Sequence, residues 1–274
     1  MRLHVEVTGQ GKPLVMLHGW GMHGGIWGDV VTHLATGFEV HNVDLPGHGA
    51  SEAQGDFTLD SIIEALDAQF GEPVAVLGWS LGGIIAQYWA ARSPQKIERL
   101  ILMASTPCFT EREDWLFGMA SEILKQFSTE LEKNHAATLR RFLALQVRGS
   151  EHERELLAAL REQLFSRGEP ALPALRGGLE ILRDADLRER LPGIKQPTLA
   201  IAGQRDKLTP PEASYYLAQV MPNARVVEIE GAAHAPFLSH PDICVAEVIK
   251  FLKNTAIENT EITEKCKTEL RPSL

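Results

Sequence analysis

Residues 74–92 constrain the fold more than any other part of the sequence. Four apolar residues at 74–77 come first, and Gly78-Trp79-Ser80-Leu81-Gly82 follows them without a break. An apolar run of this length is typical of a strand that is buried on both faces, as in a parallel sheet. Helical periodicity begins at once after Ser80 and continues to residue 92. A buried strand that turns sharply into a helix predicts an α/β fold.

The same alternation of short apolar runs and longer helical segments continues along most of the chain. We expect strands at 14–17, 40–43, 74–77, 100–103, 198–201 and 225–229, and helices at 59–70, 81–92, 211–220 and 241–253. Strands that alternate with helices in this way predict a mostly parallel, doubly wound sheet.

One long stretch interrupts the alternation. Residues 109–190 contain amphipathic helical segments, such as 115–127, 136–147 and 153–164, but no convincing strand. We therefore expect a core of residues 1–108 and 191–253, with residues 109–190 forming a helical lid over one end of the sheet. The alternative is a group of packing helices without a role in binding. Residues 254–274 are polar and charge-rich, and we expect a frayed tail there.

Composition limits the class of partner. With 27 basic and 36 acidic side chains, the net charge is −9, which disfavours nucleic acid as a partner. No run approaches the 18 apolar residues of a membrane span, and the N-terminus lacks the apolar core of a signal peptide, so we expect a cytoplasmic protein. The three cysteines, Cys108, Cys244 and Cys266, form no CxxC pattern, which makes a disulfide framework or a structural zinc site improbable.

Ser80 is the predicted nucleophile. It occupies the apex of a G-x-S-x-G turn between a strand and a helix, where the backbone is expected to be strained. Gly78 and Gly82 leave room where strand and helix would otherwise collide. The following helix N-terminus favours negative charge near the hydroxyl. The alternative is an incidental serine in a glycine-rich turn.

A serine hydroxyl needs a base and an acid partner for that base. His234 lies in a loop of small residues after the last predicted strand, and it is preferred to His240, which we interpret as a cap of the final helix. Asp206 follows the preceding strand and gives the chain order serine, acid, histidine. Asp184 and Asp186 are alternatives, but they fall in the predicted lid.

Acyl transfer also requires donors for the developing oxyanion. The backbone N–H of Leu81 directly follows the nucleophile, and the N–H of Trp20 lies in the loop after an early strand. The Trp20 indole is expected either to form a wall of the acyl pocket or to pack in the core. Asp44 ends another strand and is expected to anchor the next turn by accepting backbone N–H groups.

These motifs resemble the α/β-hydrolase superfamily over about residues 14–251. The segments 78–83, 141–146, 177–182 and 232–237 are more specifically similar to the pimeloyl-[acyl-carrier-protein] methyl ester esterases of biotin synthesis. The two matches in the lid are the most diagnostic, because lids vary widely across the superfamily.

The resemblance implies an α/β-hydrolase fold and a serine carboxylesterase without metal or cofactor. Ser80 would attack the methyl ester of a pimeloyl chain tethered to an acyl carrier protein, His234 would transfer the proton, and Asp206 would orient His234. We expect a monomer. The residues implied to line the acyl channel, beside Trp20 and Leu81, are Phe142, Leu143, Ala144, Leu145 and Gln146.

A charge pattern gives separate support for a carrier protein. Residues 134–150 contain three arginines, Arg140, Arg141 and Arg148, and no acidic residue, and Arg154 follows. Guanidinium groups pair well with carboxylate and phosphate, so these four arginines are the predicted docking site for an acidic carrier. The alternative is a solvated helix face, because three glutamates lie close by.

Two other functions stay open. A general carboxylesterase or a carbon–carbon bond hydrolase of the same fold would act on free small molecules, and a ligand receptor could retain the triad for sensing. Haloalkane and epoxide hydrolases are disfavoured, because their nucleophile is an aspartate and residue 80 is a serine.

Overall fold

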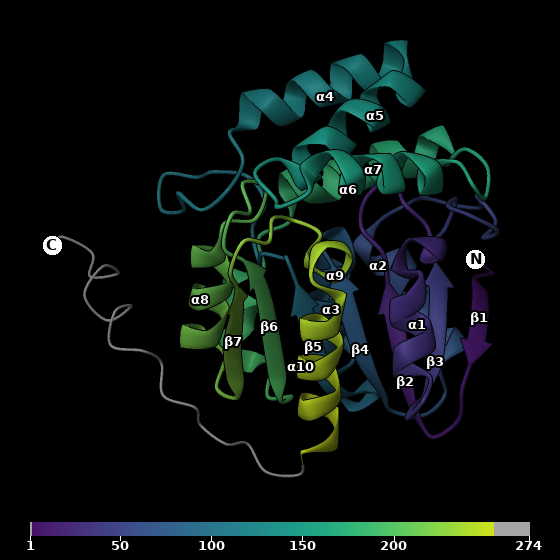
Figure 1. The fold of residues 1–274 in the computed structure, drawn as a ribbon, viewed down its shortest axis with the longest axis vertical. Coiled ribbons are helices and arrows are strands. Elements are labelled where there is room, and N and C mark those ends of the chain that lie inside the picture. The colour runs from purple at the N-terminus through teal and green to yellow at the C-terminus, as the bar shows by residue number, and fades with distance from the viewer. Residues whose placement is uncertain (1, 255–274) are drawn as a thin grey trace, which may run out of the picture.

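The computed structural model describes residues 2–254. Its centre is a seven-stranded sheet with helices on both faces (Figure 1). The strands are β1 (His4–Thr8), β2 (Lys12–Leu17), β3 (Phe38–Asp44), β4 (Val74–Trp79), β5 (Ile97–Met103), β6 (Thr198–Gly203) and β7 (Ala224–Ile229). Their order is β1-β3-β2-β4-β5-β6-β7, and all pairs are parallel except β1 with β3. The predicted mostly parallel, doubly wound α/β sheet is confirmed.

The core helices are α1 (Asp29–Leu34), α2 (Leu59–Gln69), α3 (Leu81–Arg92), α8 (Pro211–Val220), α9 (Pro236–Ser239) and α10 (Pro241–Lys253), with short 3-10 helices η1 (Gly24–Trp27), η2 (Pro94–Lys96) and η3 (Arg188–Gly193). Among the core helices, α2, α3, α8 and α10 agree closely with the sequence pattern, whereas the short α1 and α9 were not expected. Helices α1 and α10 cover one face of the sheet, and α2 and α3 cover the other (Figure 1). All residues of β4 are buried, as a central parallel strand requires.

Four further helices lie between β5 and β6 in the chain. They are α4 (Ser121–Lys133), α5 (His135–Val147), α6 (Glu153–Leu164) and α7 (Leu172–Asp184), and they form a layer above one edge of the sheet (Figure 1). We call these four helices and their connections, residues 109–190, the lid. The loops that follow β4, β6 and β7 emerge beneath this layer.

The helix expected at 115–127 is wrong at its start, because α4 begins only at Ser121. The residues before it form an irregular segment with isolated bridges, one of them between Arg112 and Trp115. The buried Trp115 indole donates to the carbonyl of Cys108 at 2.8 Å and packs edge-on against Tyr216. These long-range contacts, which local periodicity does not reveal, hold Trp115 outside the helix.

Cys108 and Cys244 are buried free thiols. Burial raises the pKa of the Cys244 thiol to about 12, so it stays protonated at neutral pH. Within residues 2–254, no helix has the length and apolar character needed to cross a membrane. The expected frayed tail, apart from Asn254, and Cys266 lie outside the described residues.

Candidate active site

The turn between β4 and α3 forces Ser80 into a strained conformation, as predicted. Ser80 has φ 55° and ψ −117°, a region that residues with a side chain rarely adopt. A Cβ atom at Gly78 would collide with the carbonyl of Gly82, and one at Gly82 would collide with the carbonyl of Leu17. Glycine at both positions is therefore what allows the strand and helix to meet at this angle. Only 5% of Ser80 is exposed beneath the lid.

The three side chains predicted as a triad lie in one chain of hydrogen bonds. The Ser80 Oγ is 2.9 Å from Nε2 of His234, and Nδ1 of His234 is 2.8 Å from Oδ2 of Asp206. All three residues are buried. They come from the loops after β4, β7 and β6, which parallel strands bring to the same edge of the sheet.

Thr209, to which the sequence analysis gave no role, helps to hold Asp206. Its hydroxyl donates to Oδ2 of Asp206 at 2.7 Å, while the backbone amides of Leu208 and Thr209 donate to Oδ1 at 2.8 and 3.0 Å. An ionised carboxylate only accepts hydrogen bonds, so Nδ1 of His234 carries a proton. Nε2 of His234 is then free to accept the proton of the Ser80 hydroxyl.

The alternative acid and base residues are occupied elsewhere. His240 stands at the N-cap position of α10, but its side chain makes no capping bond, and its Nδ1 contacts the Ser239 hydroxyl at 2.8 Å. The carboxylate of Asp184 pairs with Arg183, and that of Asp186 pairs with Arg188. Among the described residues, neither carboxylate contacts His234.

Trp79 is a second residue that sequence reasoning missed. Its indole Nε1 donates to the backbone carbonyl of His234 at 2.8 Å, and its ring packs against that of His234 with 5.8 Å between the centroids. Trp79 is fully buried. The residue before the nucleophile is thus tied directly to the loop that carries the base. Only its position in the G-x-S-x-G motif gave a signal.

Two backbone amides near Ser80 are candidates for binding an oxyanion. Leu81 is the first residue of α3, so its N–H has no partner within the helix. The loop after β2 passes close to the nucleophile, since a Cβ at Gly19 would lie 3.3 Å from Cβ of Ser80. The next amide in that loop is the N–H of Trp20, as the sequence analysis expects.

His18 orients the peptide that carries this amide. Its Nδ1 donates to the carbonyl of Gly19 at 2.9 Å, and its Nε2 accepts from the amide of Leu45 at 2.9 Å. The Gly19 carbonyl and the Trp20 N–H belong to one planar peptide, so fixing the first fixes the second. Burial, and then the neighbouring His48, lower the pKa of His18 to about 3. His18 is therefore neutral at physiological pH.

The Trp20 indole connects the core to the lid. Its Nε1 donates to the carbonyl of Leu175 in α7 at 2.9 Å, and its ring packs edge-on against Phe142 in α5 with centroids 4.9 Å apart. Only 1% of Trp20 is exposed. The loop expected to supply an oxyanion donor is thus in direct contact with two lid helices.

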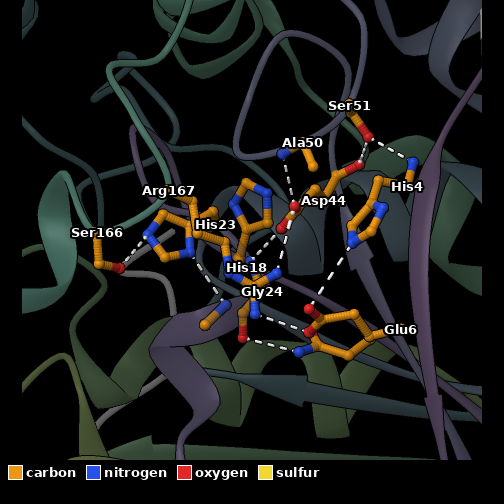
Figure 2. Close-up of polar contacts among 12 residues, drawn as sticks. His4, Glu6, His18, His23, Gly24, Asp44, Ala50, Ser51, Ser166 and Arg167 are labelled. Carbon is orange, nitrogen blue, oxygen red and sulfur yellow. Dashed lines mark hydrogen bonds and ion pairs between the residues drawn. The ribbon is translucent and has the colours of Figure 1, made fainter.

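Asp44 anchors the adjacent turn, as expected from the sequence. It accepts the amides of Gly24 at 2.7 Å and Ala50 at 2.9 Å (Figure 2). Burial alone would raise the pKa of Asp44, but these hydrogen bonds and the nearby Arg167 guanidinium bring that pKa below its ordinary value. Arg167 also pairs with Glu6 at 2.7 Å. An ionised, buried carboxylate therefore attaches the lid residue Arg167 to the core.

A histidine strengthens the same attachment. Nε2 of His23 lies 2.8 Å from the carbonyl of Gln163, at the end of α6, and 3.2 Å from the Ser166 hydroxyl (Figure 2). Burial, although partly offset by the bond to Gln163, lowers the pKa of His23. Gln163 and Ser166 of the lid are therefore bonded to the loop that follows β2.

The residues expected to line the acyl channel occupy consecutive positions of α5. Phe142 and Gln146 are buried, and their spacing of four residues places them on one face of the helix. Leu143 is also buried, whereas Ala144 and Leu145 are half-buried. A helix cannot direct five consecutive side chains into one channel, so the Trp20 contact and the shared face favour Phe142 and Gln146.

The four arginines expected to dock a carrier are all exposed, but they differ in their contacts. Arg140 lies over the ring of Phe165, and Arg141 pairs with Glu130. Within residues 2–254, Arg148 and Arg154 form no ion pair.

Known proteins resemble this chain both in sequence and in fold. A model of the α/β hydrolase fold family matches residues 12–241. A pimeloyl-[acyl-carrier protein] methyl ester esterase of Nitrosomonas europaea is 45% identical over 241 residues, which cover 88% of this chain and 95% of that protein. The chain belongs to the pimeloyl-[acyl-carrier protein] methyl ester esterase family. It is therefore a member of a family of carboxylic ester hydrolases.

A second esterase of this family, from Chromobacterium violaceum, is 45% identical over 258 residues, covering 93% of this chain and all of that protein. Among solved structures, an esterase from Exiguobacterium antarcticum superposes with a TM-score of 0.81 at 23% identity, covering 92% of this chain and 96% of that one. At that identity the likeness shows the fold alone. The family suggested by the sequence motifs is confirmed.

Proposed function

We propose that this chain hydrolyses the methyl ester of a pimeloyl group carried by an acyl carrier protein, as the names of its relatives state for them. The hydrogen-bonded series Ser80–His234–Asp206 is the observation that carries the chemical part of this proposal. Family membership supports the substrate. We include in the proposal a monomeric, cytoplasmic enzyme that contacts neither nucleic acid nor membrane.

The reaction follows from the geometry. Ser80 Oγ attacks the methyl ester carbonyl while its proton passes to Nε2 of His234, and Asp206 stabilises the imidazolium. The amides of Trp20 and Leu81 bind the oxyanion of the tetrahedral intermediate. Its collapse breaks the bond to the methoxy group, which takes the proton from His234 and leaves as methanol. Water, activated by His234, then hydrolyses the acyl-Ser80 ester and regenerates the hydroxyl.

The lid supplies the surfaces that would recognise the acyl chain. Phe142 offers an apolar wall beside Trp20. The side-chain oxygen of Gln146 is buried and has no hydrogen-bond partner among the described residues. A buried acceptor of this kind is costly unless a ligand donates a hydrogen bond to it, which supports a contact between Gln146 and a donor group of the substrate. Because Ser80 is almost completely covered, part of the lid must move for the substrate to enter.

The carrier itself would meet the exposed arginines of the lid. Arg148 and Arg154 have no competing ion pair within the described residues, so their charge is available to an acidic surface. Arg141 is already paired with Glu130, and its docking role would require that pair to open.

Replacement of the nucleophile tests the proposal. Ser80→Ala should lower kcat for the carrier-bound methyl ester by roughly 10⁶-fold, because the members of a triad act as a unit. Binding of the carrier, measured by calorimetry, should persist. Near-normal turnover by Ser80→Ala would overturn the assignment of the nucleophile.

The main alternative is an esterase for free small molecules. A comparison of kcat/KM for the carrier-bound ester with that for free dimethyl pimelate separates the two functions. The proposal predicts a clear preference for the carrier-bound ester, and equal values would favour the alternative.

A further inference from the structure

The backbone of His234 is held from two sides. On the core side, its carbonyl accepts the indole N–H of Trp79. On the lid side, its amide donates to the carbonyl of Gln146, near the end of α5, at 3.1 Å. Both bonds join residues that are distant in the sequence, so the base is held both by Trp79 at the end of β4 and by the lid.

The contact with the lid continues on both sides of His234. The preceding amide, that of Ala233, donates to the Ser150 hydroxyl at 3.2 Å, and the amide of Glu151 is 3.4 Å from the carbonyl of Gly231. A Cβ at Gly231 would lie only 2.8 Å from Oε1 of Glu151, so the two segments are in close contact. We call residues 146–151, which run from the last residues of α5 into the connection to α6, the α5–α6 junction.

The loop that carries Asp206 also contacts the α5–α6 junction. Arg205 donates from its guanidinium to the carbonyl of Gly149 at 3.3 Å, and this group lies 3.8 Å from the carboxylate of Glu151. The amide of Arg205 in turn donates to the carbonyl of Ala232 at 2.8 Å. The α5–α6 junction is therefore bonded to the loop of the base and to that of its acid partner.

The loop before His234 has no side chains that could fix its conformation by hydrogen bonds. Its residues before His234 are Gly231, Ala232 and Ala233, whose side chains offer no hydrogen bonds. Its position thus depends on backbone bonds to neighbouring segments. A general base must lie within hydrogen-bond reach of the nucleophile, and small displacements reduce the rate strongly.

We propose that the α5–α6 junction positions the catalytic base, with Ser150 as a positioning residue for His234. The lid then has a second role besides covering the substrate. Any displacement of the lid relative to the loops of Asp206 and His234 also changes the geometry of the triad. The inference rests on the triad of the proposed function, but it does not depend on the carrier substrate. Arg148 lies within the junction, so a partner bound there would act on the same element.

The test compares three variants on a substrate that needs no carrier. Ser150→Ala removes the acceptor for Ala233, and Ser150→Thr keeps a hydroxyl. Ser128→Ala is the matched control, since within residues 2–254 the hydroxyl of this half-buried lid serine bonds only to the carbonyl of Leu124 in its own helix. The measurements are kcat and KM for p-nitrophenyl butyrate and the rate of phosphonylation of Ser80 by a fluorophosphonate.

Ser150→Ala should lower kcat and the phosphonylation rate by about three- to tenfold, the effect of one neutral hydrogen bond, with KM within twofold. Ser150→Thr should restore most of the loss, and Ser128→Ala should behave as the wild type. The proposal is overturned by an unchanged kcat, by a loss confined to KM, by an equal loss in Ser128→Ala, or by no rescue in Ser150→Thr.

Amide hydrogen exchange provides a readout that does not require activity. In Ser150→Ala, peptides covering residues 231–236 should exchange faster than in the wild type, and peptides from β4 should not. Equal exchange would contradict the proposal. If the wild type itself is not phosphonylated at Ser80, the proposed function fails. If it is phosphonylated and Ser150→Ala behaves as the wild type, only the present inference fails.

Discussion

His18 affects the candidate active site by orienting the peptide group between Gly19 and Trp20. It donates to the Gly19 carbonyl, which also accepts the amide of Met22 at 3.3 Å. These bonds orient the peptide that carries the Trp20 amide beside the nucleophile. A hydrogen bond to a carbonyl also polarises the amide, which strengthens its N–H as a donor. Burial keeps the ring neutral, so Nε2 can accept from Leu45 while Nδ1 donates.

Replacement of His18 should therefore affect kcat more than KM. His18→Leu removes the donor, and kcat should fall by about tenfold, less than the 10²- to 10³-fold for complete loss of an oxyanion donor. His18→Asn can still donate and should retain more activity than His18→Leu. Steady-state kinetics with p-nitrophenyl butyrate, on variants shown by circular dichroism to be folded, measure both values. Equal kcat in the wild type and His18→Leu would show that the Gly19–Trp20 peptide is oriented without His18.

Local sequence signals explain which site residues could be predicted. Ser80, Asp206 and His234 each follow the end of a strand, and parallel strands necessarily bring such positions together. Trp79 and His18 lie within recognised motifs. No local pattern shows that the Trp79 indole reaches residue 234, or that the His18 ring bonds to the peptide that follows Gly19. Those contacts depend on how loops pack, which becomes visible only in the folded chain.

Most helices and strands of the core are predictable for a related reason, whereas the edge strand β1 and the short helices α1 and α9 are not. In α8 and α10, a proline at the first position and helical periodicity mark the start, and both bounds agree. The start of α4 was misplaced because Trp115 contributes to the apolar pattern but is held by Cys108 and Tyr216. In this part of the lid, tertiary contacts therefore decide where the helix begins, and the local sequence pattern does not predict it.

The exposed arginines of α5 and α6 should distinguish a carrier-bound substrate from a free one. Arg154→Glu reverses an exposed charge that has no ion pair among the described residues, so kcat/KM for the carrier-bound ester should fall about tenfold, mainly through KM. Turnover of p-nitrophenyl butyrate should not change. Arg141→Glu should act in the same direction, although it also breaks the pair with Glu130.

Lys125→Glu provides the control for this prediction. It makes the same change of charge at an exposed residue of α4, a helix that carries none of the four arginines expected to dock a carrier. Kinetics with both substrates at two salt concentrations test the pattern. An equal loss on both substrates in Arg154→Glu, or the same loss in Lys125→Glu, would remove the docking hypothesis.

At the scale of the whole molecule, buried histidines should make the fold sensitive to acid. Burial lowers the pKa of His18 to about 3 and that of His48 to about 4, whereas both groups titrate near 6.5 in the unfolded chain. Between pH 6.5 and 4 the unfolded chain thus binds protons that the folded chain does not. The free energy of unfolding should fall with decreasing pH, by at most about 1.4 kcal/mol per pH unit for each histidine.

Urea unfolding at pH 7, 6 and 5 measures this dependence. His48→Gln should reduce the slope between pH 6 and 5, whereas replacement of the exposed His33 by glutamine should not. Asp44 acts in the same direction at lower pH, because its depressed pKa means that stability is lost as the pH falls below about 4. A free energy of unfolding that is constant from pH 7 to 5 would contradict the account.

The whole molecule combines a rigid sheet with a lid attached at defined points. Arg167 and His23 bind the end of α6 to the core, and the α5–α6 junction binds its beginning to the catalytic loops. Helix α6 is therefore fixed at both ends. Helix α4 lies farthest from the sheet (Figure 1).

Mass spectrometry of the reacted carrier tests the central claim most directly. The protein is incubated with methyl-pimeloyl acyl carrier protein, and the intact carrier is weighed alongside a reaction with Ser80→Ala. We predict that the carrier loses only its methyl group, with the thioester and acyl chain retained, and that Ser80→Ala leaves the mass unchanged. A carrier stripped of its whole acyl chain, or one left unaltered by the wild type, would contradict the account.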